Sequence, residues 1–333
     1  MIGKTNNILQ LKNLSIGYDK PIQKNINLFA DKTELISVIG KNGIGKSTLL
    51  RTIAGLQLKL SGDIYFEDKE IDLLNLKDKS KKISFVSTGA PNYINIKIRE
   101  LVALGRFPHT NMFGNLSAND TKIINETICL TGIEHIAEKN IYEVSEGELQ
   151  RAMIARALSQ DTDLLIFDEP TAFLDIPNRY EILYLLKRLS RESGKTIIFS
   201  SHDLNIVMQL SDKIWLMKEN GIIFGAPEDL VLNNNFEDLF INKNLKFVKN
   251  TGQFSFVTDK QYLINVKGDG LAFEWTKKAL DRAGFNYTCN KQHDVNVTIL
   301  SSNNSVKWVF EKENNKFVFD SIYQLIKNIN NLI

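Results

Sequence analysis

Short apolar runs alternate with helical segments over the first two thirds of the chain. Ile8 to Ile16 alternates loosely between apolar and polar residues and predicts a strand, and Glu34 to Ile39 predicts a second strand that leads into a Gly-rich segment. From Ser47 to Leu56 the pattern is helical. Further short apolar runs cover 164–167, 196–200, 213–218 and 221–224. Strands that alternate with helices predict an α/β fold with a mainly parallel sheet, whose functional groups lie at the carboxyl ends of the strands.

Two stretches depart from this pattern. Residues from about 86 to 160 are mostly helical and predict a helical subdomain inserted in the α/β core. Residues 233–250 are polar and rich in Asn and Lys, which is typical of a linker. We therefore expect a first domain over 1–232, a linker over 233–250 and a small C-terminal α/β domain over 251–333.

The C-terminal segment predicts strands and helices of its own. The expected strands include 254–257, 262–266, 295–299 and 306–310. A closing helix is expected over 322–329, and an amphipathic helix over 271–283 that Gly284 can cap. The residues expected to share the apolar face of that amphipathic helix are Leu271, Trp275, Ala279 and Ala283. We expect Trp275 and Trp308 to form the core of a domain that regulates the protein or helps it dimerise.

Composition narrows the class of protein. Hydrophobic residues make up 43% of the 333 residues and charged residues 24%, as in an ordinary globular protein. The net charge of +2 lacks the basic surplus of a nucleic-acid binder. The two cysteines, Cys129 and Cys289, are far apart in sequence, which favours a reduced cytosolic protein with two buried thiols. The polar start shows no signal peptide, and no apolar run reaches the roughly 18 residues that span a bilayer, so a membrane role requires a partner.

Residues 40–48 read GKNGIGKST and fit the phosphate-binding pattern G-x-x-x-x-G-K-[ST]. Glycines let the backbone wrap closely around a triphosphate, so that its N–H groups converge on the oxygens, and the next helix directs its positive N-terminus at the phosphates. We expect Lys46 to reach the β- and γ-phosphates, Ser47 to ligate Mg²⁺ and Thr48 to contact the α-phosphate. The other residues expected to contact the nucleotide here are Gly40, Lys41, Asn42, Gly43 and Gly45.

The apolar run 164–167 ends in two carboxylates. Asp168 is positioned to hold Mg²⁺, and Glu169 is positioned to polarise the attacking water as general base. His202 follows the run 196–200 and is positioned to contact the γ-phosphate. Taken alone, an apolar run that ends in Asp-Glu is a common strand end, and a lone histidine is usually a surface or core residue. Together with the phosphate loop they predict catalytic roles for Lys46, Glu169 and His202.

A segment between these motifs, Val144 to Arg151, reads VSEGELQR. It resembles the signature LSGGQ-x-QR of the ABC-transporter ATPase family, and the resemblance extends over roughly residues 8–228. In that family the signature of one subunit closes over ATP bound to the other, which implies a head-to-tail homodimer in which Ser145, Gly147 and Glu148 contact the nucleotide. Ser145 and Glu148 also have the spacing of a capping box, so a helix begins here and its N-terminus can face a γ-phosphate.

The resemblance implies further roles. Tyr18 stands where an aromatic ring stacks on adenine, Asp175 matches the D-loop aspartate that crosses the dimer, and His202 matches the switch histidine. Thr88 stands where the family has a glutamine, and its shorter side chain implies an altered or indirect contact with Mg²⁺. The signature also departs from the family at Glu146 and at Glu148, which places carboxylates near a polyphosphate.

The segment Leu101 to His109 reads LVALGRFPH. It resembles VALGR-[YF]-P-H in ABC importers of iron-siderophore, haem and cobalamin complexes, and Ser201 to Asn205 is also similar to that group. In that group the segment belongs to the part of the fold that faces the permease. No partner ligands lie at suitable spacing from His109, so we do not assign it to a metal site.

The resemblance therefore implies a P-loop NTPase core that binds ATP with Mg²⁺, hydrolyses ATP to ADP and phosphate, and powers an importer. The implied partners are membrane-spanning permease subunits, a second copy of the chain and, indirectly, a substrate-binding protein, with no nucleic acid. The implied location is peripheral, at the cytoplasmic face of the inner membrane.

Other classes fit less well. An ABC ATPase that acts on nucleic acid or ribosomes usually has two cassettes or a long coiled coil, whereas this chain has one cassette and no long heptad run. A switch GTPase would carry N-K-x-D, and an exporter ATPase often carries a fused membrane domain; neither is present.

Overall fold

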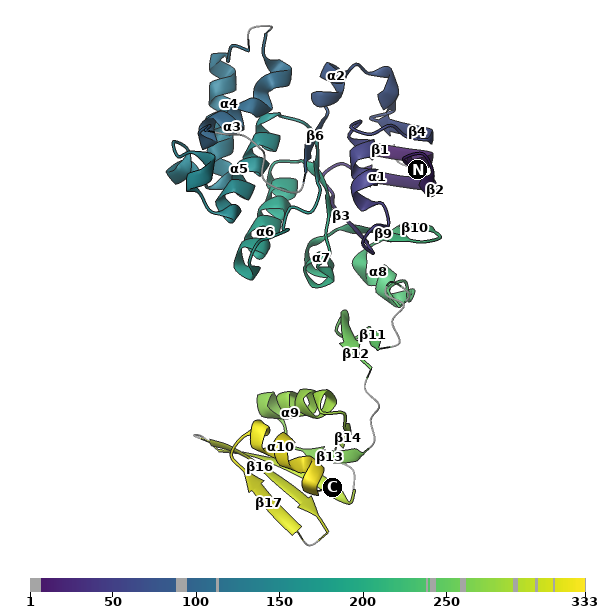
Figure 1. The fold of residues 1–333 in the computed structure, drawn as a ribbon, viewed down its shortest axis with the longest axis vertical. Helices are drawn as coiled ribbons and strands as arrows, with labels where there is room; N and C mark the ends of the chain where they lie inside the picture. Colours follow the sequence, from purple (N-terminus) through teal and green to yellow (C-terminus); the bar gives the residue numbers. More distant parts are fainter. Residues whose placement is uncertain are drawn as a thin grey trace, which may run out of the picture. The chain divides into compact units, whose positions relative to one another are not determined.

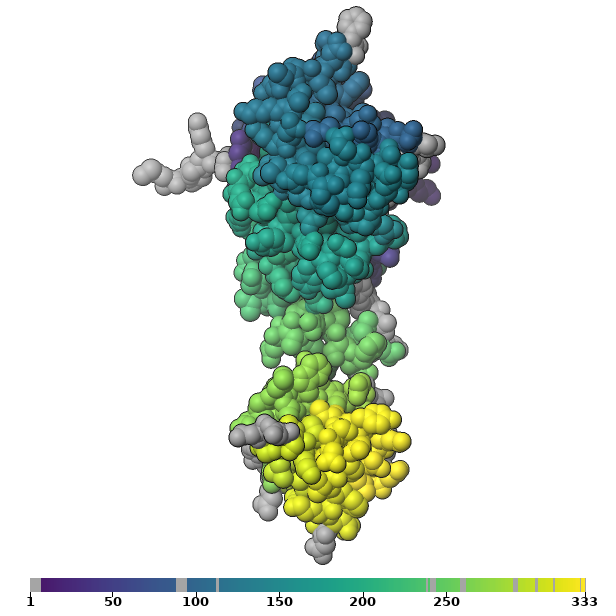
Figure 2. Space-filling model, turned by 90° about the vertical axis from the view of Figure 1, so that its left-hand side faces the viewer, coloured from purple at the N-terminus to yellow at the C-terminus, as the bar shows by residue number. Residues whose placement is uncertain are grey.

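The protein is represented by a computed structural model, which describes residues 7–87, 95–111, 114–237, 239, 244–257, 262–289, 293–302, 305–313 and 315–332. The chain divides into two compact units. The first comprises Met1–Ile241 and Phe247–Gln253, and the second comprises Asn242–Lys246 and Phe254–Ile333. Figure 2 shows the residues of the helical segment of the first unit in blue, and those of the second unit in light green and yellow.

The main sheet of the first unit has the strand order β10-β9-β3-β8-β7-β6. Figure 1 labels four of its strands, β3, β6, β9 and β10. Its strands are β3 (Leu35–Gly40), β6 (Ile83–Val86), β7 (Leu164–Phe167), β8 (Thr196–Ser200), β9 (Lys213–Lys218) and β10 (Gly221–Gly225). Only the pairing of β10 with β9 is antiparallel. All residues of β3, β7 and β8 are buried, as in parallel sheets that are covered on both faces.

A second sheet of this unit is antiparallel and has the order β2-β1-β4-β5. Its strands are β1 (Asn7–Gly17), β2 (Pro21–Asp31), β4 (Ser61–Phe66) and β5 (Lys69–Glu70). Residues of β1 and β3 share one apolar cluster with helix α1 (Lys46–Ile53), for example Leu9, Val38 and Leu50. The phosphate loop therefore begins and ends on elements that are anchored in the same core.

Other helices complete the first unit. They are α2 (Leu76–Ser80), α3 (Ile98–Ala103), α4 (Ala118–Thr131), α5 (Glu146–Ser159), α6 (Ile176–Glu192), α7 (Leu204–Leu210) and α8 (Pro227–Leu232), with 3₁₀ turns at Ile71–Leu73, Leu104–His109, Glu134–Ile136 and Ile141–Glu143. Figure 1 shows α3, α4 and α5 grouped beside β6. The predicted helical segment is therefore present.

The segment Leu101–His109, with the sequence LVALGRFPH, connects these helices through hydrogen bonds and close packing. Arg106 is buried and donates from Nε to Asp120 Oδ1 on α4 at 2.8 Å, and from Nη1 to the carbonyl oxygen of Ser159 at 2.7 Å. A Cβ atom on Gly105 would lie 2.1 Å from the carbonyl oxygen of Arg156 and 2.1 Å from Ser159 Oγ. Glycine is thus required where this segment meets α5. His109 Nε2 lies 2.9 Å from the carbonyl oxygen of Gln160, so this ring nitrogen is hydrogen-bonded to the main chain.

The second unit has a mixed sheet with the order β14-β13-β15-β16-β17. Its strands are β13 (Leu263–Lys267), β14 (Asn286–Cys289), β15 (Val295–Ser302), β16 (Ser305–Lys312) and β17 (Asn315–Phe319). Helices α9 (Gly270–Arg282) and α10 (Ile322–Leu332) share a core with it that includes Leu280, Phe310 and Leu325. A separate hairpin consists of β11 (Leu245–Val248) and β12 (Gln253–Phe256).

The predicted apolar face of α9 is partly wrong. Trp275 is 54% exposed and Leu271 is 76% exposed, whereas Thr276 and Leu280 are fully buried. Ala279 is buried as predicted. Thr276 can take a core position beside it because its hydroxyl accepts from Trp308 Nε1 at 2.7 Å and donates to the carbonyl oxygen of Ala272 at 2.7 Å. Trp308 is buried as predicted.

The prediction of two buried thiols is wrong, since Cys129 on α4 and Cys289 on β14 are both exposed. Among the residues that the structure describes, no helix is both long enough and apolar enough to cross a membrane.

Candidate functional site

The phosphate loop joins β3 to α1. Gly43 and Gly45 have φ values of 76° and 107°, a region that favours glycine, so the backbone of the loop depends on both. Gly45 is the N-cap of α1 and makes no side-chain cap, which leaves the first N–H groups of the helix available to an anion. A main-chain cradle with the positive end of a helix is a phosphate-binding geometry.

Lys46 supplies a buried positive charge beside this cradle. Its side chain is 5% exposed, and Nζ donates to the carbonyl oxygens of Gly40 at 3.0 Å and Lys41 at 3.2 Å. Burial lowers the pKa of Lys46, and the nearby carboxylates of Glu169 and Asp168 oppose that shift. Lys46 is thus held under the loop, with carboxylates close by.

Asp168 follows β7 and is bonded by two hydroxyl groups. Its Oδ1 accepts from Ser47 Oγ at 3.0 Å and from Ser200 Oγ at 2.8 Å. Asp168 is 3% exposed and Ser200 is fully buried. The sequence predicted that Ser47 and Asp168 would meet, and it missed Ser200, whose only signal was a polar residue at the end of the apolar run 196–200.

Glu169 has an unusual backbone conformation and contacts His202. Its φ is 51°, which is uncommon for a residue other than glycine. Its N–H donates to Ser200 Oγ at 2.8 Å, and its Oε1 lies 2.5 Å from Nε2 of His202. The carboxylate and the imidazole both remain partly exposed, at 28% and 44%, so the pair is open to a ligand.

These side chains surround an open cavity of about 460 Å³. Its lining consists of Tyr18, Ile22, Asn42, Gly43, Gly45, Lys46, Ser47, Thr48, Glu169 and His202. Tyr18, at 64% exposure, lies at the same cavity as the phosphate loop. Ile22 was not predicted, because a single apolar residue in β2 carries no recognisable spacing.

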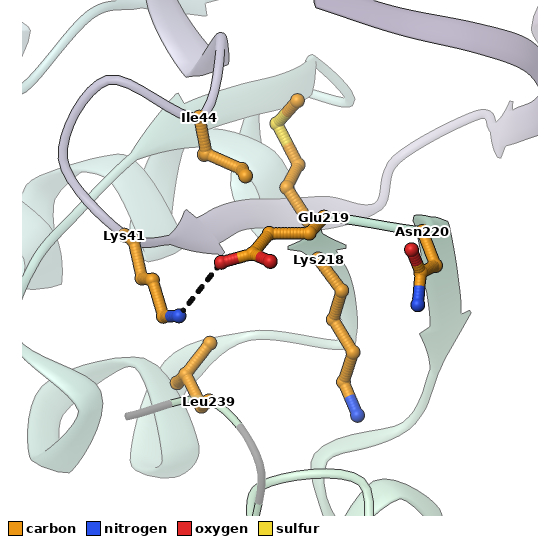
Figure 3. Close-up of a pocket in the computed structure, with 7 residues that line it drawn as sticks. Lys41, Ile44, Lys218, Glu219, Asn220 and Leu239 are labelled. Atoms are coloured by element: carbon orange, nitrogen blue, oxygen red, sulfur yellow. Dashed lines mark hydrogen bonds and ion pairs between the residues drawn. The ribbon is translucent and has the colours of Figure 1, made fainter. Parts of the chain in front are cut away.

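Lys41 does not line this cavity. Its Nζ forms an ion pair at 3.0 Å with Glu219 Oε1, and both residues lie at a separate pocket of about 150 Å³ beside Ile44 and Leu239 (Figure 3). The side chain of Lys41 therefore points to the turn between β9 and β10, while its carbonyl oxygen holds Lys46. The side chain of Lys41 is thus turned away from the cavity in this structure.

The predicted signature lies at the N-terminus of α5. Ser145 is the N-cap: its Oγ accepts from the N–H of Glu148 at 3.3 Å, and Glu148 Oε2 accepts from the N–H of Ser145 at 2.8 Å. Hydrogen bonds from the amide and hydroxyl of Ser145 are the main cause of the lowered pKa of Glu148, and His135 adds to it. The Glu148 carboxylate is thus turned back onto the cap, as the capping-box spacing predicted.

Other predicted residues lie apart from the cavity. Ser145 and Glu146 are exposed, Gly147 is buried, and none of the three lines the cavity of its own chain. Asp175 is exposed and caps α6, where its Oδ1 accepts from the N–H of Asn178 at 3.1 Å. Thr88 lies outside the described residues.

Comparison with known proteins identifies the family. A family model described as ABC transporter matches residues 23–172, and one described as iron ABC transporter C-terminal domain matches residues 260–330. The uncharacterized ABC transporter ATP-binding protein MJ0873 of Methanocaldococcus jannaschii is 38% identical over 249 residues, which cover 74% of this chain and 86% of that protein. The chain belongs to the ABC-transporter ATP-binding protein family. As a member of this family it is an ATP-binding subunit that hydrolyses ATP to power transport.

Two further relatives of this ABC protein bear on its assembly and cargo. The iron(3+)-hydroxamate import ATP-binding protein FhuC of Bacillus subtilis is 38% identical over 218 residues, or 65% of this chain and 81% of FhuC. A dimeric, post-hydrolysis structure of the ATP-binding cassette MJ0796 with ADP and Pi matches with a TM-score of 0.57 at 28% identity, and covers 66% of this chain and 98% of that one. The P-loop NTPase fold predicted from the sequence is thereby confirmed.

Proposed function

We propose that this ABC ATPase powers an importer of iron-siderophore, haem or cobalamin complexes. The observation that carries the proposal is one cavity in which the phosphate loop, the carboxylate of Glu169 and the imidazole of His202 meet. The relatives support the cargo class, since FhuC is named for import of iron(3+)-hydroxamate and the C-terminal match is to an iron ABC transporter domain.

The site is suited to ATP with Mg²⁺. The Ser47 hydroxyl and the Asp168 carboxylate lie 3.0 Å apart, and both are the hard oxygen donors that Mg²⁺ prefers. When bound, Mg²⁺ would neutralise charge on the β- and γ-phosphates. Lys46 and the main-chain N–H groups of the loop hold the phosphates, and Tyr18 offers its exposed ring to the adenine.

Hydrolysis requires a base for the attacking water. Glu169 presents a partly exposed carboxylate at the cavity, and His202 orients that carboxylate through the 2.5 Å contact. We assign Glu169 as general base, and His202 as a residue that contacts the γ-phosphate. Because His202 already contacts Glu169, the Glu169 carboxylate is in position when the nucleotide enters.

The signature requires a second copy of the chain. Ser145 is exposed and lies outside the cavity of its own chain, while its capped helix presents an N-terminus that favours an anion. We propose a head-to-tail homodimer in which Ser145, Gly147 and Glu148 of one copy and Asp175 complete the nucleotide site of the other. The dimeric state of the MJ0796 cassette supports this arrangement.

The remaining partners follow from the proposed import function. The dimer would bind membrane-spanning permease subunits at the cytoplasmic face of the inner membrane, and would act only indirectly on a substrate-binding protein. The near-zero balance of charge, +2 over 333 residues, gives no electrostatic basis for binding nucleic acid. The departures at Thr88, Glu146 and Glu148 would set the rate of hydrolysis and leave Lys46, Asp168 and Glu169 in place.

Glu169→Gln tests the proposal. The variant should bind MgATP and accumulate as an ATP-bound dimer, with kcat reduced at least about 100-fold because the base is lost. Glu126→Gln, on the surface of α4, is the control and should behave as the parent. ATP hydrolysis and dimer formation by gel filtration are the measurements.

The same trapped variant tests the partner. From solubilised membranes Glu169→Gln should capture a polytopic permease. The control Glu126→Gln should also capture the permease, but it should not accumulate as an ATP-bound dimer. Parent-like hydrolysis by Glu169→Gln would refute the assignment of the base. Capture of ribosomes or DNA alone would support instead an ABC ATPase that acts on nucleic acid.

A further inference from the structure

Ser200 connects the two carboxylate residues of the site. It is the last residue of β8 and is fully buried. Its Oγ donates to Asp168 Oδ1 at 2.8 Å and accepts from the N–H of Glu169 at 2.8 Å. One hydroxyl thus contacts the side chain of the proposed metal ligand and the main chain of the proposed base.

We propose that Ser200 is a positioning residue for ATP hydrolysis: it fixes the Asp168 carboxylate for Mg²⁺ and, through the main chain of Glu169, the carboxylate that activates water for attack on the γ-phosphate. This inference rests on the proposed function. Ser200 does not line the cavity, so it acts through its neighbours and not on the nucleotide.

The first part of the argument concerns Asp168. In the structure its Oδ1 accepts from Ser47 as well as from Ser200. Ser47 lies at the cavity and would be a ligand of a bound Mg²⁺, whereas Ser200 does not line the cavity and would hold the Asp168 carboxylate from within the protein. Partners that hold a metal-binding carboxylate from behind fix its orientation, and their loss typically weakens metal binding or activity.

The second part concerns Glu169. Its φ of 51° is unfavourable for a residue with a side chain, and such conformations persist where neighbouring groups impose them. The hydrogen bond from its N–H to Ser200 Oγ is such a constraint. Because the direction of the Glu169 side chain depends on this backbone conformation, Ser200 also fixes where the carboxylate meets His202.

The neighbouring strand supplies a matched comparison. Ser37 on β3 is fully buried and pairs with Phe199, the residue before Ser200 on β8. Its hydroxyl makes no hydrogen bond to any residue that the structure describes. A buried serine hydroxyl without a partner is therefore tolerated in this sheet, and the double bonding of Ser200 is specific to its place beside the site.

The test compares Ser200→Ala with Ser37→Ala, and Ser200→Thr with Ser200→Val. Thr and Val have nearly the same shape, so that pair isolates the hydroxyl from the added methyl group. The measurements are kcat per nucleotide-binding site, KM for MgATP, dependence on Mg²⁺ and melting temperature. Dividing by the number of binding-competent sites removes any loss that is due only to misfolded protein.

We expect kcat per site to fall roughly 10- to 100-fold in Ser200→Ala and Ser200→Val. Ser200→Thr should retain most of the parental kcat, and Ser37→Ala should match the parent. KM for MgATP should change less than about threefold, because the phosphate loop is untouched, and half-maximal activity should require more Mg²⁺.

Two failures are distinguishable. If the parent and Ser37→Ala bind MgATP and do not hydrolyse it, the proposed function fails. If they hydrolyse it, and Ser200→Ala or Ser200→Val does so within twofold of Ser37→Ala, only the role of Ser200 is overturned. Equal losses in Ser200→Thr and Ser200→Val also overturn it, because the hydroxyl would then make no difference.

Discussion

Buried charges in the first unit are stabilised by different partners. Lys46 is bonded by two main-chain carbonyl oxygens of its own loop. Arg106 and Asp120 form an ion pair whose side chains are only 4% and 6% exposed. A buried pair with additional hydrogen bonds stabilises one arrangement, because removing either partner leaves an unpaired charge in a medium of low dielectric constant.

Asp120 makes the stability of the helical segment depend on pH. Hydrogen bonds from the hydroxyl and the amide of Ser117 and the Arg106 guanidinium lower the pKa of Asp120 from 3.8 to about 2. Because the folded-state pKa is depressed, the stabilisation is complete above about pH 5 and is lost as the pH falls towards 2. The parent should lose about 1 kcal/mol more unfolding free energy between pH 5 and pH 3 than Asp120→Asn loses.

Urea unfolding at the two pH values measures this difference. Asp120→Asn should be the less stable protein at pH 7, since Arg106 is then left without a charged partner. An equal loss in the parent and the variant would show that Asp120 titrates alike in the folded and unfolded chains.

Which site residues could be predicted depends on how local their chemistry is. Lys46 and Ser47 follow from a loop pattern, and Asp168 and Glu169 follow from a strand that ends in carboxylates. The structure brings these residues together as expected. Ser200 was out of reach because its role arises from two hydrogen bonds across neighbouring strands, which one serine in an apolar run does not reveal.

At the scale of elements, strands buried on both faces were the most predictable. The runs 164–167 and 196–200 coincide with β7 and β8, because continuous apolar residues permit little else in a covered parallel sheet. Strands β2 and β4 were missed because their burial alternates irregularly; β1, to which both pair, contains register shifts that break a period of two. The misplaced face of α9 shows the same limit, since a bonded Thr276 can occupy a core position.

Packing between the helical elements should be sensitive to Gly105. In Gly105→Ala the added Cβ atom would overlap main-chain and side-chain oxygens of α5, so the two segments must separate. We expect a loss of about 2 kcal/mol or more in unfolding free energy. Chemical denaturation of the full chain measures it.

Gly225→Ala is the control for this substitution. There the new Cβ atom would meet Leu230 Cδ2 at 3.7 Å, which is an ordinary contact. The φ of Gly225 is not in the positive region that would strain an alanine. Its stability should stay within about 0.5 kcal/mol of the parent. Equal effects at both glycines would mean that the contact with α5 relaxes freely.

At the scale of the whole molecule, the two compact units have separate apolar cores. The cluster of the first unit includes residues of β1, β3 and α1, and that of the second includes Leu280, Phe310 and Leu325. A chain with two cores can unfold in two steps, one for each unit. A ligand that binds one unit raises the temperature at which that unit unfolds.

Phe310→Ala should separate the two steps. Truncation of a fully buried phenylalanine typically costs about 3–5 kcal/mol, and we expect one calorimetric transition to move down by 10 °C or more. MgATP should raise the midpoint temperature of the other transition, that of the first unit, in both the parent and the variant. A single transition that responds to both changes would show that the cores unfold together.

The two exposed cysteines have a practical consequence. The sequence contains only these two, and one lies on α4 of the cassette while the other lies on β14 of the C-terminal unit. The natural chain therefore carries one attachment point for a maleimide dye on each unit. A donor and an acceptor fluorophore on these two residues can test, with no engineered residue, whether the distance between them changes during ATP turnover.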